Sequence, residues 1–275
     1  MTLDQGTEAG PVRHPAVAGM FYEDQPARLR RDVRGFLDRA AGAVSEPAPK
    51  AIIAPHAGYP YSGPVAGSAY AAVKALRRRI RRVVLLGPAH RVYFRGLAAS
   101  SAQAFATPLG SVPVEQDALR ALCTEAGAPA CYSDQAHAME HSLEVQLPFL
   151  QEILDEFSIL PFAVGDADPS DVASLIERLW GGAETLIVVS SDLSHYRGYQ
   201  AAREIDSITM RKIQELDDAG LTGEHACGYL PISGLLRVAL RRGLRCEVLD
   251  MRSSGDTAGP RDRVVGYGAF AFYPQ

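Results

Sequence analysis

Four polar residues that are suited to chemistry follow apolar runs in this sequence, and three of them are histidines. His56 follows the run AIIA, His90 follows VVLL, and Asp192 and His195 follow LIVV. If these runs are strands of one parallel sheet, their carboxyl ends meet at the edge where such sheets bind ligands. Imidazole is the commonest metal ligand and the usual general base near neutral pH. The pattern therefore predicts a metal site, a general base, or both.

His141 lies in the segment Glu140-His141-Ser142, ahead of a stretch with leucines at helical spacing. An acid and a hydroxyl at this position suit the amino-terminal cap of a helix. Capping leaves the histidine unexplained, so a catalytic role for His141 is an equally open alternative.

Cys227 lies in a turn that leads into a segment beginning near Pro231. A thiolate close to a helix amino terminus has a lowered pKa, which suits metal ligation or redox chemistry. The alternative is a small thiol that only packs in the turn.

The elements that must position these residues alternate between strands and helices, which indicates an α/β fold. Most of the strands read as continuous apolar runs, as expected where helices cover both faces of a sheet. We expect a single domain over residues 11–275 with a central, mostly parallel sheet flanked by helices, and a flexible amino-terminal segment 1–10. The predicted strands are 51–54, 83–86, 159–164, 186–189, 246–249 and 264–272, and the predicted helices are 26–41, 64–76, 115–126, 142–157, 169–180, 201–218 and 231–242.

Composition excludes several classes of protein. The 275 residues are 47% hydrophobic, which is enough for a sizeable core, and 28 basic against 32 acidic residues give a net charge of −4. No excess of positive charge is present to attract nucleic acid or an anionic membrane, and no apolar run approaches the ~20 residues that span a bilayer. Four scattered cysteines and a polar start without the order of a signal peptide lead us to expect a cytoplasmic protein with reduced thiols.

Motifs of other enzyme classes are missing from the sequence. It holds no glycine-rich dinucleotide fingerprint, no phosphate-binding loop of the G-x-x-x-x-G-K-[ST] type, no G-x-S-x-G elbow and no H-E-x-x-H pair. Nucleotide binding and serine hydrolysis therefore have no support.

Five segments, in this order and spacing, resemble the Memo family, whose bacterial members are called component B of the AmmeMemoRadiSam system. The resemblance covers about residues 11 to 273. The segments are Pro-His-Ala-Gly-Tyr at 55–59 with Tyr-Ser-Gly at 61–63, Leu-Gly-Pro-Ala-His at 86–90, Glu-His-Ser-Leu-Glu at 140–144, Ser-Ser-Asp-Leu-Ser-His-Tyr at 190–196, and the turn around Cys227.

This resemblance implies a fold similar to the class III extradiol dioxygenases, whose iron is held by two histidines and a glutamate. His56 and His90 match the two histidine ligands, and Cys227 stands where the glutamate is expected. His195 matches the acid/base histidine of those enzymes, with Asp192 beside it. A thiolate in place of the carboxylate is softer, and it suits copper, iron or zinc.

We therefore expect a copper- or iron-dependent oxidoreductase with His56, His90 and Cys227 as ligands and with His195, Asp192 and His141 as catalytic residues. An alternative is an interaction protein that binds a peptide or small ligand and keeps a relic site. Further alternatives are an extradiol-type dioxygenase and a zinc hydrolase. The resemblance also implies other AmmeMemoRadiSam components as partners, whereas the substrate stays open.

Overall fold

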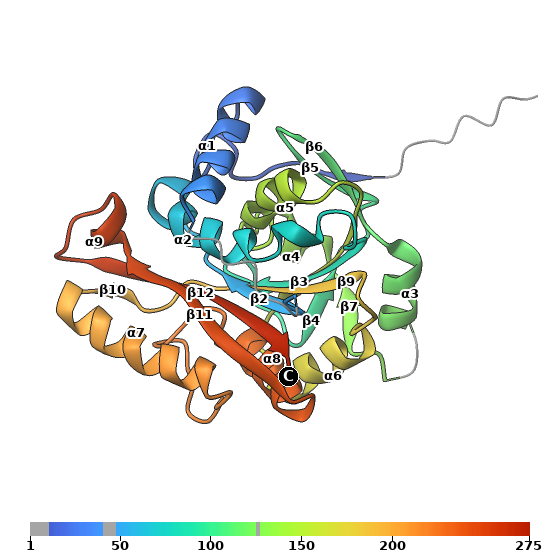
Figure 1. Ribbon diagram of the computed structural model, residues 1–275. Coiled ribbons are helices and arrows are strands. Elements are labelled where there is room, and N and C mark those ends of the chain that lie inside the picture. Colours follow the sequence, from blue (N-terminus) through green and yellow to red (C-terminus); the bar gives the residue numbers. More distant parts are fainter. Residues whose placement is uncertain (1–10, 41–47, 125–126) are drawn as a thin grey trace, which may run out of the picture.

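The computed structural model describes residues 11–40, 48–124 and 127–275, and it shows an α/β arrangement with one mixed sheet between two layers of helices (Figure 1). The expectation of a flexible segment at 1–10 lies outside the described residues. The strands are β1 Val12–Arg13, β2 Ala51–Ala54, β3 Arg82–Pro88, β4 Leu97–Ala99, β5 Ala104–Thr107, β6 Gly110–Pro113, β7 Ala130–Tyr132, β8 Ser158–Val164, β9 Thr185–Ser190, β10 His195–Arg197, β11 Leu244–Ser253 and β12 Val264–Pro274. The helices are α1 Pro26–Arg39, α2 Tyr59–Ala71, α3 Gln116–Thr124, α4 Asp134–Ala138, α5 Leu147–Ile153, α6 Pro169–Arg178, α7 Tyr199–Gln214, α8 Tyr229–Arg241 and α9 Ser254–Thr257, with 3-10 turns η1 Lys74–Leu76 and η2 Glu144–Gln146.

Four parallel strands, in the order β2-β9-β3-β8, form the centre of the main sheet. Antiparallel strands extend it on both sides. On one side β12 pairs with β2, and β10 and β11 pair with β12. On the other side β4 pairs with β8, and β7 pairs with β4. The predicted parallel core is confirmed, and the antiparallel flanks make the sheet as a whole mixed. A small second sheet has the order β1-β5-β6.

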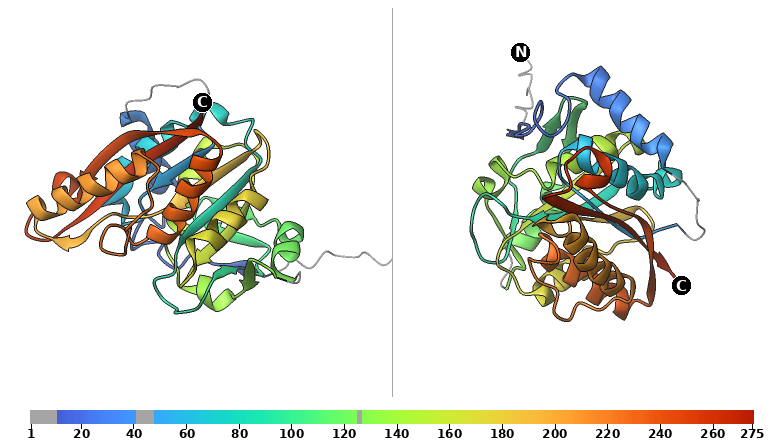
Figure 2. Two further views of the ribbon diagram at one scale, coloured as in Figure 1. Left: turned by 90° about the horizontal axis from the view of Figure 1, so that it is seen from below. Right: turned by 90° about the vertical axis from the view of Figure 1, so that its left-hand side faces the viewer.

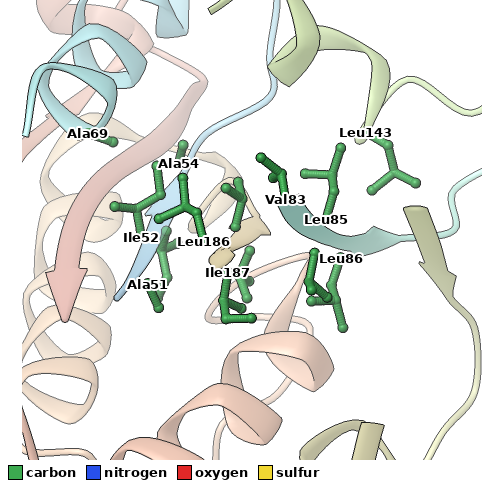
Figure 3. Close-up of a cluster of buried hydrophobic side chains, with 14 of the residues drawn as sticks. Ala51, Ile52, Ala54, Ala69, Val83, Leu85, Leu86, Leu143, Leu186 and Ile187 are labelled. Atoms are coloured by element: carbon green, nitrogen blue, oxygen red, sulfur yellow. The ribbon is translucent and has the colours of Figure 1, made fainter. Parts of the chain in front are cut away.

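Helices cover both faces of the main sheet, which explains why its central strands are apolar throughout. One layer contains α1, α2 and α5, and the other contains α6, α7 and α8 (Figures 1 and 2). Every residue of β2 and β9 is buried. Figure 3 shows part of the resulting core, where side chains of β2, β3 and β9 pack together.

Helix α1 follows from its sequence. Leu29, Val33 and Leu37 recur at four-residue intervals and are the buried residues of the helix, so they form one apolar stripe. Helix α1 packs closely against α2. A Cβ added at Gly63 would stand 2.5 Å from the Phe36 ring, so a side chain there would push the two helices apart.

The structure corrects one predicted helix and adds elements that were not predicted. Residues 142–157 do not form a continuous helix: they form η2, then α5, and the backbone is extended at Leu154. Pro148 lies in the first turn of α5, where its missing N–H costs nothing. Strands β4 to β7 and helix α4 were not predicted, because runs of three to five residues carry too little periodicity.

Candidate metal centre

Three neighbouring strands carry the predicted polar residues to the same edge of the sheet. Strand β9 lies between β2 and β3 and is parallel to both. His56, Asp192 and His90 each stand two residues beyond the end of their strand, which is Ala54 for β2, Ser190 for β9 and Pro88 for β3. The equal offset brings the three loops together, as the sequence pattern predicted.

Cys227 joins this edge from the turn before α8. Its backbone N–H donates to the carbonyl of Asp192 at 3.3 Å, which ties the turn to the loop after β9. Its Sγ lies 3.3 Å from Nε2 of His56. One ligand atom each from His56, His90 and Cys227 lie within 4.8 Å of one another, so these side chains can hold a metal ion.

Hydrogen bonding of Ser190 determines which nitrogen of His56 is available. The Ser190 hydroxyl donates its one proton to the carbonyl of Ser142 at 2.6 Å and accepts from Nε2 of Gln146 at 2.8 Å. It therefore also accepts from Nδ1 of His56 at 2.9 Å. Nε2 of His56 is left with its lone pair directed toward Cys227.

Glu140 has the same effect on His90. Nδ1 of His90 lies 3.0 Å from the carboxylate of Glu140, so it donates to that carboxylate and leaves the lone pair of Nε2 free. The carboxylate also accepts from the backbone N–H groups of His90, His141 and Ser142. A carboxylate behind a histidine orients the ring and strengthens it as a ligand in many metal sites.

His195 and Asp192 lie at the same edge but share no hydrogen bond in the described residues. Nδ1 of His195 donates to the carbonyl of Leu193 at 2.8 Å, which again leaves Nε2 bare. Oδ1 of Asp192 instead accepts from the backbone N–H of His56 at 2.7 Å and of Ala57 at 3.3 Å. The aspartate therefore holds the His56 loop, and it does not orient the His195 ring by a direct hydrogen bond.

His141 packs inside the cluster, in the turn before η2. Its ring stacks on His90, with centroids 4.7 Å apart, and meets the edge of Phe21 at 4.8 Å. Its Nδ1 is buried and lies 3.2 Å from Oε1 of Glu140, but it makes no hydrogen bond within the described chain. Glu140 accepts the N–H groups of His141 and Ser142, as the capping alternative expected of a neighbouring residue, but it caps the turn before η2, because α5 begins only at Leu147.

Burial keeps two histidines of the cluster, His56 and His141, neutral. It lowers the pKa of His56 well below its usual range, and the neighbouring histidines lower it further. Burial likewise lowers the pKa of His141 to about 4. Glu140 is the opposite case: burial acts against its ionisation, but hydrogen bonds and charge interaction with His90 hold its pKa at about 2. Neutral imidazoles beside an ionised carboxylate are the protonation states that a metal ion requires.

The pKa of the Cys227 thiol differs from the expectation drawn from its place before a helix. Burial raises this pKa well above the usual range, and the nearby Asp192 raises it further. The cost of burying a thiolate exceeds the benefit of the helix dipole here, so the group is a thiol unless a cation binds beside it.

Several residues of the site were not predicted as such from the sequence. Glu140 and Ser190 determine which ring nitrogen of His90 and of His56 stays bare. Gln146 donates to the Ser190 hydroxyl, and the Tyr70 hydroxyl in turn donates to the side-chain oxygen of Gln146 at 2.8 Å. Glu140 and Ser190 are direct neighbours of predicted site residues in the sequence. Gln146 and Tyr70 carry no such signal.

These features define the class: an α/β protein with a two-histidine, one-cysteine cluster at the carboxyl edge of its parallel strands, in which His56 is buried and His90 is open to solvent. Residues 13–271 match the family described as Memo-like protein. A MEMO1 family protein of Metallosphaera sedula is 34% identical over 280 residues, which cover 94% of this chain and 99% of the relative. Relatives of the same name from Saccharolobus solfataricus and Methanothermobacter thermautotrophicus are also 34% identical, over 94% and 93% of this chain and 99% and 98% of their own lengths.

The chain belongs to the Memo family, which confirms the resemblance seen in the sequence. None of the described helices combines the length and the apolar character that crossing a membrane requires.

Proposed function

We propose that this protein is a metal-dependent oxidoreductase that holds copper or iron through His56, His90 and Cys227. The observation that carries the proposal is the shared use of Nδ1. In three histidines, Nδ1 donates a hydrogen bond to a protein acceptor and Nε2 makes no such bond. They are His56, His90 and His195. A histidine with Nδ1 engaged by the protein and Nε2 bare can act as a ligand or as a base, and three such histidines meet at this edge.

Two imidazoles and one thiolate form a borderline-soft donor set, which suits copper and iron and also accepts zinc. A bound copper or iron ion would supply one-electron redox chemistry that the side chains lack. His195 would hold or transfer a proton at Nε2, since its ring is partly exposed and its Nδ1 is already engaged. Asp192 would keep the His56 loop in place.

The exposure of His90 supports a route for a small substrate. Its side chain is 28% exposed, whereas His56 is buried. A ligand would therefore reach the cluster past His90. We propose a small molecule as this ligand, other AmmeMemoRadiSam components as partners, and the cytoplasm as the location, where a reduced Cys227 would persist.

Anaerobic titration with Cu(I), and separately with Fe(II), tests the ligand set. We expect His56→Ala, His90→Ala and Cys227→Ser each to lower the affinity at least about a hundredfold, because each removes a direct ligand. The exposed His14 offers a control, and His14→Ala should bind as the parent does. Parent-like binding by the three ligand variants would refute the proposed site.

A second measurement separates redox chemistry from the alternatives. Oxygen uptake by the metal-loaded protein, measured against a panel of catechols and other reductants, should fall about a hundredfold in His195→Ala. The metal affinity of this variant should stay within about tenfold of the parent, because an outer group is changed. Tight binding of Zn(II) alone, without oxygen uptake, would favour the hydrolase in place of the oxidoreductase.

A further inference from the structure

A second cavity, of about 450 Å³, lies between the amino-terminal segment and helix α4. Its walls come from residues 11–16, 100–102 and 134, and from residues 137–139 at the end of α4, and none of the three candidate ligands lines it. The volume lies within the range of small-molecule sites, which is about 300–1,000 Å³. This cavity is therefore distinct from the metal centre and large enough for a ligand.

The charged side chains in the wall are already compensated by the protein. The Arg13 guanidinium donates to the carboxylate of Glu144 and to the carbonyls of Glu140 and His137. The carboxylate of Asp134 accepts from both hydroxyls and one backbone N–H of Ser100 and Ser101. Because the protein already satisfies Arg13 and Asp134, neither side chain needs an oppositely charged ligand. The cavity therefore favours a neutral occupant.

Most of the remaining lining is apolar. Two of its side chains, Val12 and Met139, are 36% and 59% exposed, which leaves apolar surface for an occupant to cover. Pro11, Pro15, Ala16, Ala102 and Ala138 complete this apolar part of the wall.

His137 supplies the polar group that gives the cavity a directional preference. The residue is 2% exposed, and its Nε2 lies 2.9 Å from the carbonyl of Ala98. A carbonyl only accepts, so Nε2 carries the proton. Burial lowers the pKa of His137 to about 4, so the ring is neutral at pH 7 and Nδ1 keeps its lone pair. No donor among the described residues reaches this Nδ1, and the nitrogen is not fully enclosed by the protein, so it can accept from a molecule in the cavity.

We propose that this cavity binds a small neutral aromatic or apolar molecule with one N–H or O–H donor, which His137 accepts at Nδ1. The volume limits the size of the ligand, and the apolar wall requires that most of its surface is apolar. The imidazole nitrogen without a partner requires one N–H or O–H donor on the ligand. The inference is independent of the proposed oxidoreductase function, because it uses none of the candidate ligands.

Indole and 1-methylindole are suitable probes, because they differ only in the N–H that the proposal requires. In an NMR titration of the full chain, we expect indole to shift the backbone amides of residues 100–102 and 134–139 with about millimolar affinity. The affinity of 1-methylindole should be about tenfold weaker, since the hydrogen bond to Nδ1 of His137 is lost.

A pair of variants places the binding in this cavity. Ala138→Phe puts a ring into the cavity from an exposed position, so it should fold normally and abolish the shifts. Ala27→Phe makes the same change at an exposed position in the first turn of α1, and it should bind indole as the parent does. Each of three results would overturn the proposal: no shifts in the parent at about 10 mM indole, equal affinity for both probes, or unchanged binding in Ala138→Phe. A competing self-association, seen as indole affinity that rises on dilution of the protein, would assign the cavity to a second copy and also overturn it.

Discussion

Carboxylates at the two edges of the central sheet differ in exposure and in hydrogen-bond partners. At the amino edge, Glu115 meets Arg82 at the start of β3, with side chains that are 23% and 34% exposed. At the carboxyl edge, the Glu140 side chain is 1% exposed and accepts from backbone N–H groups and one imidazole. Glu144 is fully buried there and accepts from Arg13, two backbone N–H groups and the Tyr22 hydroxyl.

The two arrangements differ in how firmly they fix geometry. A partly exposed ion pair tolerates movement, because water can replace either partner at modest cost. A buried carboxylate surrounded by oriented donors holds every one of those donors in place. The carboxyl edge is therefore built to fix positions, and the amino edge is built to neutralise charge.

Glu144→Ala should lower the free energy of unfolding by about 3–5 kcal/mol, because it leaves the buried Arg13 charge and other buried donors without a partner. Urea unfolding followed by circular dichroism measures the loss. The double variant Arg13→Met/Glu144→Ala should recover part of it, since the uncompensated charge is then gone. A loss below about 1 kcal/mol in the single variant, which is typical of an exposed pair, would show that the buried Glu144 holds its partners no more firmly than an exposed carboxylate does.

Glu140→Gln should leave the fold intact but lower the Cu(I) or Fe(II) affinity about ten- to a hundredfold, because His90 loses the carboxylate that orients it. The same anaerobic titration measures this effect. Glu115→Gln at the amino edge is the matched control and should keep the parent affinity. Equal affinities of the two variants would show that Glu140 has no role in preparing a ligand.

Asp206 provides a pH-dependent test at the carboxyl edge. It accepts from the backbone N–H of Ser194 in the loop after β9, and burial raises its pKa to about 6. The native state then holds this proton more tightly than the unfolded chain, whose value is near 3.8, so stability falls as pH rises from about 4 to about 6. Relative to the parent, Asp206→Asn should gain about 2 kcal/mol across this window in urea unfolding. A constant difference between parent and variant from pH 4 to pH 7 would contradict the raised pKa.

Glu115→Gln at the amino edge should cost the least, at most about 1 kcal/mol in low salt. The loss should shrink in 0.5 M NaCl, because exposed charges are screened over less than about 10 Å. Thermal unfolding at the two salt concentrations gives the comparison. A cost as large as that of Glu144→Ala would show that both edges fix geometry in the same way.

The sequence predicted the parallel core and the loops of His56, His90 and Asp192, because an apolar run buried on both faces followed by a polar residue is a local signal. It failed for residues 142–157, where local spacing suggested one long helix. Glu144 and Gln146 interrupt that helix, since their buried polar groups are satisfied by Arg13 and Pro55, which are 131 and 91 positions away. Such distant partners leave no trace in local periodicity.

The same reason limits the prediction of the site. The ligand set followed from the family resemblance, whereas the donor nitrogen of each histidine depends on groups brought close only by folding. Ser190 reaches His56 across 134 positions, and Glu140 reaches His90 across 50. The high pKa of Cys227 likewise depends on burial, which its position before a helix does not reveal.

Strand β12 joins segments that lie far apart in the sequence into one sheet. It pairs with β2 on one side and with β11 on the other, and β10 also pairs with it. During synthesis, the outer edge of β2 therefore has no partner until residues 264–274 have been made. An unpaired strand edge of this kind is open to misassociation with other chains.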